Sequence, residues 1–266
     1  MKKLEYLINY LLEENKDIKV TRIPYDEKDK KILYRSLCNI RKPNKISNEY
    51  LEIENEYLQE ELNLKKITQI EDIELVNETI PNNNLKYKDK ICLWNGDITT
   101  LKIDAIVNAA NSQGLGCFVP CHKCIDNQIN SNSGISLRLE CDKIMKEKDY
   151  CLNTGETFIT KAYNLPAKYV IHTVGPIIYN EVTKIEEEQL ANCYINSLKL
   201  ALKHGIKNIA FPCISTGEYR FPKNQASKIA ISTVEKFLEE HTKEFERIIF
   251  NVYGEEDYEI YEQNFK

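Results

Sequence analysis

The N-terminal part of the chain places its apolar residues at helical spacing. Leu4, Ile8 and Leu11 recur at i, i+4 and i+7 and so form one apolar stripe. Similar stripes lie within residues 32–40 and 48–62, which predicts three amphipathic helices. These helices are either a docking module for a partner or substrate protein, or they pack on the rest of the chain and cover its surface. The second interpretation is favoured, because amphipathic helices commonly bury their apolar stripe.

Beyond a polar, proline-containing break, short apolar runs alternate with longer helical patterns. We predict a helical N-terminal extension over residues 1–76, a linker over 77–86 and a main domain over 87–266. The alternation is typical of a sheet with helices on both faces, a three-layer α/β/α fold, here with a mixed central sheet. Strands are predicted at 91–94, 105–108, 157–162, 169–173, 209–212 and 248–252, and helices at about 136–148, 186–204, 224–241 and 257–265.

Composition narrows the possible partners and the compartment. The 266 residues carry a net charge of −5, which argues against a general nucleic-acid-binding protein, because phosphate contacts need clustered Lys and Arg. No apolar run is long enough to span a membrane. The start of the chain becomes acidic at Glu13 and Glu14 and lacks a small-residue cleavage site, so no signal peptide is expected. The nine cysteines show no disulfide pattern, and we expect a reducing, cytoplasmic location.

Polar side chains follow the apolar run at 105–107. Asn108 and Asn111 carry amides that can donate and accept hydrogen bonds at a strand end, where α/β sheets bind ligands. Asp126 is the carboxylate near this end, and it is either a general base, a hydrogen-bond partner for hydroxyls, or a helix cap. His172 stands in an apolar strand pattern and is interpreted as a buried core histidine.

Four potential metal ligands occur within eight residues: Cys117, Cys121, His122 and Cys124. Thiolate and imidazole at this spacing are zinc ligands. All four would form a closed structural site, whereas three would leave a position open for water or substrate. The pair Cys121 and Cys124 has the spacing of a zinc knuckle. Against this, adjacent side chains in an extended loop point apart, as those of Cys121 and His122 would. Three free thiols without a metal are the least favoured alternative.

Two further segments are candidates for ligand binding. Asp97 follows a strand and a glycine, where it can cap a turn or accept hydrogen bonds from a ligand. The loop over residues 215–219 connects a strand to a helix, so its backbone N–H groups can bind an anion such as a pyrophosphate. Taken alone, this loop is better explained as an ordinary turn between a strand and a helix, because such turns are common. Its members are Ser215, Thr216, Gly217, Glu218 and Tyr219.

The chain resembles a macrodomain, the ADP-ribose-binding fold, over roughly residues 87–255. The resemblance rests on Asn-Gly-Asp-Ile-Thr at 95–99, Val-Asn-Ala-Ala-Asn-Ser at 107–112, Ile-His-Thr-Val-Gly-Pro at 171–176 and Ile-Ser-Thr-Gly at 214–217. It implies that Asp97 accepts the exocyclic amine of adenine and that the amide of Ile98 contacts the ring. It also implies that loop 215–219 binds the pyrophosphate, with Tyr219 near the distal ribose.

The segment 116–126 departs from the common macrodomain pattern, a glycine run followed by an aspartate. It is similar to the zinc-dependent branch, whose pattern is Gly-Cys-Phe-x-Pro-x-His-x-Cys-Ile-Asp. This resemblance implies a Zn²⁺ cofactor held by Cys117, His122 and Cys124, with no ligand required at residue 121. It also implies catalytic roles for Asp126, on the distal ribose or the attacking water, and for Asn111, on the distal ribose. Zinc-type macrodomains carry a similar helical extension.

The activity implied by the resemblance is zinc-dependent hydrolysis that removes ADP-ribose from mono-ADP-ribosylated protein side chains, by cleavage at the anomeric carbon. The alternative is a non-catalytic ADP-ribose reader with a structural zinc, and a weaker third possibility is a phosphatase acting on ADP-ribose phosphates. The expected partners are ADP-ribose and a modified protein. Zinc-type relatives resemble parts of systems that pair an ADP-ribosylating sirtuin with a lipoylated carrier protein, so such a carrier is a candidate substrate. Neither nucleic acid nor membrane is expected as a partner.

Overall fold

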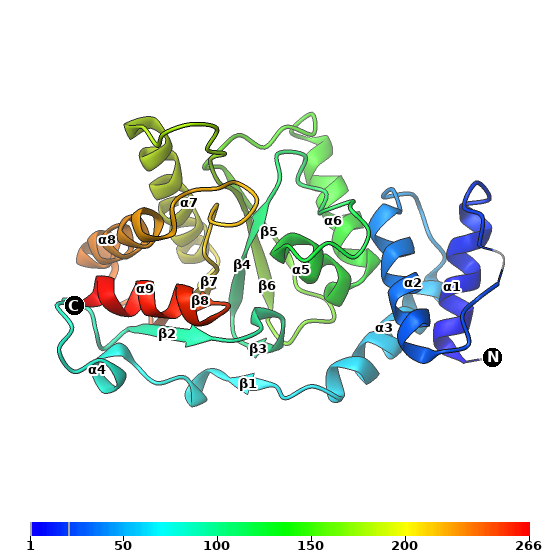
Figure 1. The fold of residues 1–266 in the computed structure, drawn as a ribbon, viewed down its shortest axis with the longest axis horizontal. Helices are drawn as coiled ribbons and strands as arrows, with labels where there is room; N and C mark the ends of the chain where they lie inside the picture. The colour runs from blue at the N-terminus through cyan, green and yellow to red at the C-terminus, as the bar shows by residue number, and fades with distance from the viewer. Residues whose placement is uncertain (1, 21) are drawn as a thin grey trace.

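A six-stranded sheet forms the centre of the computed structural model, which describes residues 2–20 and 22–266 (Figure 1). The strand order is β2-β8-β7-β4-β6-β5, and every neighbouring pair is parallel except the antiparallel pair β5–β6, so the sheet is mixed as predicted. The strands are β2 (Ile91–Asn95), β4 (Ala105–Ala110), β5 (Thr157–Lys161), β6 (Tyr169–Val174), β7 (Asn208–Phe211) and β8 (Arg247–Val252).

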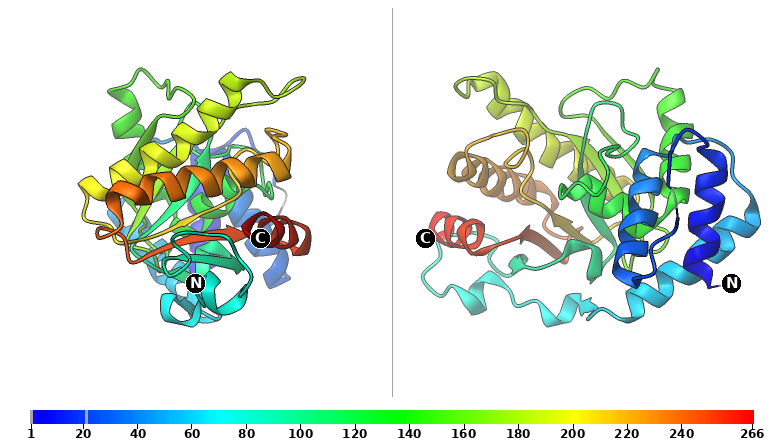
Figure 2. Two further views of the ribbon diagram at one scale, coloured as in Figure 1. Left: turned by 90° about the vertical axis from the view of Figure 1, so that its left-hand side faces the viewer. Right: turned by 45° about the vertical axis from the view of Figure 1, so that its right-hand side comes forward.

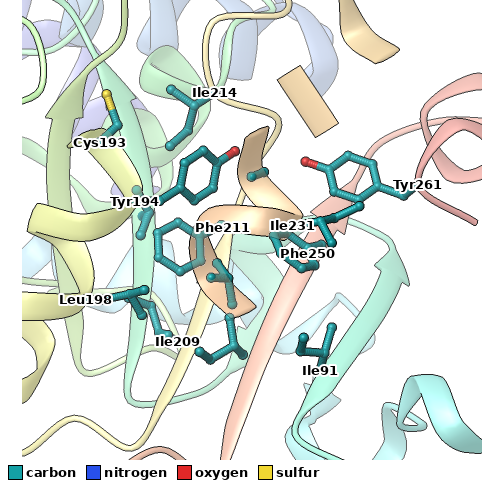
Figure 3. Packing of buried hydrophobic residues seen from close by; sticks show 14 of the residues in the cluster. Ile91, Cys193, Tyr194, Leu198, Ile209, Phe211, Ile214, Ile231, Phe250 and Tyr261 are labelled. Atoms are coloured by element: carbon teal, nitrogen blue, oxygen red, sulfur yellow. The ribbon is translucent and has the colours of Figure 1, made fainter. Parts of the chain in front are cut away.

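Helices cover both faces of this sheet. Successive strand residues point to opposite faces, so Val107 belongs to one apolar core and Ile106 to the other. The first core lies under α7 (Lys184–Lys203), α8 (Lys223–His241) and α9 (Glu255–Phe265), and Figure 3 shows part of its packing. The second core lies under α5 (Ile125–Ser133) and α6 (Ile135–Lys146). These three layers are the predicted α/β/α architecture.

The three predicted N-terminal helices are present as α1 (Lys3–Glu14), α2 (Glu27–Ile40) and α3 (Asn48–Asn63). They form an apolar core of their own, which Ile135 of α6 joins. In Figure 1 and Figure 2 these helices lie at the same end of the molecule as the green α5 and α6, and α2 contacts α5. The packing supports the interpretation in which the extension covers part of the main domain.

The segment between α3 and β2 contains short elements that the sequence pattern did not indicate. The two-residue strand β1 (Thr68–Gln69) pairs in parallel with β3 (Leu101–Lys102), which lies between β2 and β4 in the chain, and α4 (Val76–Thr79) is a single turn. Ile80 and Leu85 are buried in the first core. The boundaries set for the extension and the linker stay a prediction.

Each predicted strand and helix has a counterpart, but α5 was not predicted. Its sequence is rich in Asn and Ser, which are poor helix formers. Cys124 caps the start of the helix, where its Sγ accepts a hydrogen bond from the Asn127 backbone N–H at 3.4 Å. The helix buries Ile129 and the polar Asp126. Among the described residues, no helix combines the length and the apolar character needed to cross a membrane.

Candidate functional site

A cavity of about 500 Å³ opens at the carboxyl ends of the strands. Its wall is built from the ends of β4, β6, β7 and β8 and from the loop before α5, in agreement with the place where open α/β sheets bind ligands. The volume lies in the range of sites for small molecules and cofactors. Lining residues among those predicted are Asn111, Cys117, His122, Cys124, Asp126 and Ser215, Thr216, Gly217, Glu218 and Tyr219.

Asp126 lies in the first turn of α5 and is 4% exposed. Its Oδ1 accepts hydrogen bonds from Asn108 Nδ2 at 2.8 Å and from Asn130 Nδ2 at 3.0 Å. Its Oδ2 accepts one longer bond, from Asn111 Nδ2 at 3.3 Å. Burial raises the pKa of this carboxyl to about 6, although the bond from Asn108 acts in the opposite direction. The amides fix the carboxylate, and Oδ2 keeps room for a further donor.

His172 is a buried core histidine, as predicted, and it helps to orient Asn108. It is 2% exposed and stacks on Phe158 with 4.4 Å between ring centroids. Its Nδ1 lies 3.2 Å from Asn108 Nδ2, and its Nε2 lies 3.0 Å from Thr160 Oγ1. Burial lowers the pKa of the imidazole to about 3, so the ring is neutral and Nδ1 can accept from the amide.

Cys117, His122 and Cys124 come together in the ligand loop, by which we mean residues 113–124. One potential ligand atom of each lies within 4.8 Å of the others, and Cys117 Sγ is 3.9 Å from His122 Nδ1. In a tetrahedral zinc site the ligand atoms stand about 3.5–4 Å apart, given bonds of about 2.0–2.3 Å. Two thiols and an imidazole in this arrangement therefore fit zinc in both chemistry and approximate spacing.

Cys121 lies outside this group. Its backbone is in the left-handed region with φ 52°, which turns the side chain toward α2. The Sγ atom lies 3.2 Å from Ser36 Oγ and 3.5 Å from the Ile32 carbonyl oxygen. The structure thus brings together Cys117, His122 and Cys124, the three residues of the zinc-type pattern, and leaves Cys121 outside. Zinc binding itself stays a prediction.

The loop over residues 215–219, here called the phosphate loop, follows β7 and borders the cavity. Ser215 adopts φ 65°, is 6% exposed, and its Oγ has no hydrogen-bond partner within the described residues. A Cβ at Gly175 would lie 1.9 Å from this oxygen, so only glycine fits there. Glu218 Oε1 lies 3.4 Å from His122 Nε2. A buried hydroxyl without a partner at a cavity wall is suited to bind a ligand oxygen.

Asp97 and Ile98 are not among the residues that line the cavity. Asp97 caps the 3-10 helix η2 (Ile98–Thr100), where its Oδ1 accepts from the Thr99 backbone N–H at 2.9 Å and from Thr99 Oγ1 at 2.7 Å. The turn nevertheless borders the site, because Asn251 lines the cavity and donates to the Gly96 carbonyl at 2.9 Å. Adenine binding by Asp97 stays a prediction.

Comparison with known proteins identifies the family. The Macro domain family profile matches residues 107–230. A Protein-ADP-ribose hydrolase from Treponema medium is 47% identical over 256 residues, which cover 96% of this chain and 95% of that protein. The chain belongs to the macrodomain family.

Further relatives agree with this macrodomain assignment. A Protein-ADP-ribose hydrolase from Staphylococcus aureus (strain MSSA476) is 42% identical over 264 residues, 99% of this chain and 95% of that protein. The crystal structure of a Trypanosoma brucei macrodomain in complex with ADP-ribose aligns with a TM-score of 0.66 at 32% identity, covering 83% of this chain and 91% of that one. An Oceanobacillus iheyensis macrodomain with ADP aligns with a TM-score of 0.60 at 36% identity, covering 66% and 90%. The predicted fold class is confirmed.

Several cavity residues of this macrodomain were not predicted from the sequence. Gly175, Asn251, Tyr253 and Asp257 line the cavity, and the Tyr253 ring is 81% exposed. Asn251 and Tyr253 lie at the end of a predicted strand, so the rule that ligands bind at carboxyl ends could have found them. Gly175 stands within a recognised motif, but its role depends on its contact with Ser215. Asp257 lies in the first turn of α9 and had no comparable signal in the sequence.

Proposed function

We propose that this macrodomain is a zinc-dependent hydrolase that removes ADP-ribose from mono-ADP-ribosylated protein side chains. The observation that carries the proposal is that one cavity is lined by the loop over residues 215–219, a fixed buried carboxylate and a Cys-His-Cys cluster. Relatives that match nearly the whole chain at 42% and 47% identity are Protein-ADP-ribose hydrolases, which supports the reaction class.

The phosphate loop would hold the pyrophosphate of the ligand. Its backbone N–H groups and the Ser215 hydroxyl supply donors. A Cβ added at Gly217 would meet no atom within 4 Å, so the backbone there is open to a ligand. Asp97 and Ile98 would read adenine at the β2 end, as the macrodomain pattern implies. The ligand would then run from η2 across the phosphate loop toward α5.

Asp126 and Asn111 would act on the distal ribose and the attacking water. Asp126 Oδ2 has room for a further hydrogen bond, while Oδ1 is held by two amides. A carboxylate fixed in this way can accept a hydrogen bond from a ribose hydroxyl or a proton from water as the bond at the anomeric carbon breaks. Asn111 donates to Asp126 and to the Gly116 carbonyl, so it would hold the carboxylate and the start of the ligand loop in one geometry.

The zinc would be held by Cys117, His122 and Cys124, which leave a position for an oxygen ligand. Bound there, zinc supplies Lewis-acid stabilisation of negative charge on oxygen. Burial raises the pKa of the Cys124 thiol to about 12, so this thiol is protonated unless a cation is bound beside it.

The similarity of segment 116–126 to the zinc-dependent branch further supports a lipoylated carrier protein, modified by a sirtuin-type transferase, as the substrate.

The test is release of free ADP-ribose from a purified mono-ADP-ribosylated carrier protein by the zinc-loaded enzyme. Carriers modified on carboxylate, hydroxyl, amine and thiol side chains are compared, since the acceptor chemistry sets the leaving group. The proposal predicts release from at least one of them, with more than one turnover per enzyme. Binding of ADP-ribose with no release from any of the carriers would instead identify a reader.

A further inference from the structure

Helix α2 of the N-terminal extension binds the backbone of the ligand loop. Arg35 donates from Nη2 to the carbonyl oxygen of His122 at 2.9 Å. One turn later along α2, Asn39 Oδ1 accepts a hydrogen bond from the backbone N–H of Cys121 at 2.8 Å. The extension therefore holds the two peptides that flank the Cys121–His122 bond, and His122 is a candidate metal ligand.

Arg35 also reaches the other end of the cluster through Asn127. Its Nη2 and Nε donate to Asn127 Oδ1 at 2.6 and 3.2 Å. Asn127 is fully buried, and its Nδ2 donates to the Val119 carbonyl at 2.9 Å. Its backbone N–H donates to Cys124 Sγ at 3.4 Å. The planar guanidinium presents several donors in a fixed geometry, so a single side chain fixes both His122 and the amide that contacts Cys124.

A second arginine joins α2 to the remaining candidate ligand. Arg138 of α6 is 6% exposed, and its Nη1 donates to the carbonyls of Cys38, Asn39 and Arg41 at 2.9, 2.8 and 2.7 Å. Carbonyls at a helix C-terminus have no hydrogen-bond donor within the helix, and Arg138 supplies the donors at the end of α2. The same guanidinium donates from Nη2 to the Cys117 carbonyl at 3.2 Å. The end of α2 and the peptide of Cys117 are thus bonded to one buried side chain.

The ligand loop has little hydrogen bonding of its own to replace these contacts. It contains no helix or strand, and within residues 115–123 of the described chain the single backbone–backbone bond runs from His122 N–H to the Val119 carbonyl, 3.2 Å. Backbone groups removed from water need partners, and here α2 and α6 provide several of them. The apolar core of the extension lies elsewhere, among α1, α2 and α3. Loss of the Arg35 contacts should therefore disturb the loop more than the fold.

We propose that Arg35 is a positioning residue for the metal cluster, so that the N-terminal extension is a structural part of the active site. Its guanidinium sets the peptide of His122 and, through Asn127, the surroundings of Cys124. The effect on zinc rests on the proposed function. The effect on the order of the ligand loop does not, because these contacts exist between protein groups alone.

The test compares Arg35→Gln and Arg35→Lys with the matched control Lys31→Gln. Lys31 lies one turn earlier on α2, and its ammonium pairs with Glu61 of α3 at 2.7 Å, so this variant removes the same charge without touching the loop. Zinc affinity is measured by competition with a chromophoric chelator. Hydrogen–deuterium exchange of residues 117–124 is measured in the zinc-free full-length protein, and thermal unfolding checks the fold.

Arg35→Gln should bind zinc about tenfold more weakly, at the lower end of the effect of removing a partner that orients a metal ligand. Its ligand loop should exchange faster, with Lys31→Gln equal to wild type. Arg35→Lys should be intermediate, because its ammonium still donates hydrogen bonds but lacks the planar geometry of the guanidinium. Folded Arg35→Gln with wild-type zinc affinity and loop exchange would overturn the proposal, as would equal effects in Lys31→Gln. If wild type binds no zinc, the cofactor proposal fails, and the exchange comparison still decides whether Arg35 positions the loop.

Discussion

His122 Nε2 lies 3.4 Å from Glu218 Oε1, and this contact joins the ligand loop to the phosphate loop across the cavity. A carboxylate beside Nε2 favours the tautomer with its proton there, which leaves the lone pair on Nδ1. Nδ1 is the nitrogen that faces Cys117 Sγ, 3.9 Å away. The imidazole is therefore oriented with its basic nitrogen toward the thiols, as a metal ligand requires.

The first prediction concerns zinc content. Protein purified without chelator should contain close to one zinc per chain, because the cluster offers thiol and imidazole ligands at suitable spacing. Replacing Cys117, His122 or Cys124 should lower occupancy strongly. Cys121→Ser is the control and should keep most of the metal, because its Sγ faces Ser36. Metal analysis by mass spectrometry decides this, and complete loss of zinc from Cys121→Ser would favour a closed four-ligand site.

The second prediction uses the unpaired hydroxyl of Ser215. Ser215→Ala should weaken ADP-ribose binding by about 1.5–3 kcal/mol, the range for a hydrogen bond to a charged group such as the pyrophosphate. Stability should stay the same or rise slightly, because the buried Oγ has no partner in the described protein to lose. Ser197→Ala is the matched control, since Ser197 Oγ is likewise buried and unpaired there but lies on α7 outside the cavity wall. Calorimetry showing equal losses of affinity in both variants would refute a specific role for Ser215.

Much of the fold could be predicted because its signal is local. Apolar runs such as residues 105–107 belong to strands covered on both faces, and the apolar stripe around Leu4, Ile8 and Leu11 is buried in the core of the extension. Helix α5 could not be predicted in this way. Its sequence favours turns, and it is helical because burial and the Cys124 cap outweigh local propensity.

The candidate site could be predicted where its residues share one motif, as Cys117, His122 and Cys124 do. The residues that contact the site and hold it in place are distant in sequence, and no local pattern predicts them. Arg35 contacts Asn127 across 92 residues, a pairing set by how the extension packs on α5. The residues after β8 line the cavity because the strand order is β2-β8-β7. The alternation of strands and helices along the sequence does not determine this order.

The third prediction separates the two roles available to Asp97. Asp97→Ala should weaken ADP-ribose binding by about 1.5–3 kcal/mol, the range for a hydrogen bond to a charged group. Asp97→Ser can still cap η2. It should bind ADP-ribose nearly as weakly as Asp97→Ala does, because it lacks the carboxylate that would accept a hydrogen bond from adenine. Zinc content should not change in either variant. Full affinity in Asp97→Ser with loss in Asp97→Ala would show that the cap is what matters.

The fourth prediction concerns a buried carboxyl in the extension. Glu54 is fully buried, accepting hydrogen bonds from Tyr34 Oη at 2.7 Å and from the Ile135 backbone N–H at 2.9 Å. Burial raises its pKa from 4.5 to about 7, against the opposing effect of these bonds. Because the folded state binds the proton more tightly, its contribution to stability is complete below pH 4.5 and is lost as the pH rises through about 7.

Glu54→Gln should remove this dependence. Relative to the variant, wild type should lose up to about 3 kcal/mol of unfolding free energy between about pH 4.5 and pH 8, from the size of the pKa difference. Urea unfolding at several pH values measures it. Parallel stability curves for the two proteins over this interval would show that Glu54 does not titrate there.

In the proposed mechanism, Asp126 and the zinc cluster act on the bond at the anomeric carbon. Removing an interaction that is made mainly in the transition state lowers the reaction rate. Removing an interaction that is made equally in the ground state and the transition state lowers the binding affinity. Asn111→Ala should impair both, because Asn111 would position the same ribose before and during the reaction. Circular dichroism must first show that the variants and the zinc-free protein are folded, since removal of a metal can unfold a loop.

The most direct measurement is single-turnover release of ADP-ribose from a mono-ADP-ribosylated carrier protein, with ADP-ribose affinity measured in parallel by calorimetry. Wild type, Asp126→Ala and chelated wild type are compared. We predict that both altered forms lose at least about 100-fold in rate, the usual contribution of a general acid or base, while affinity falls far less. Release at the wild-type rate by the folded, zinc-free protein or by Asp126→Ala would contradict the proposed mechanism.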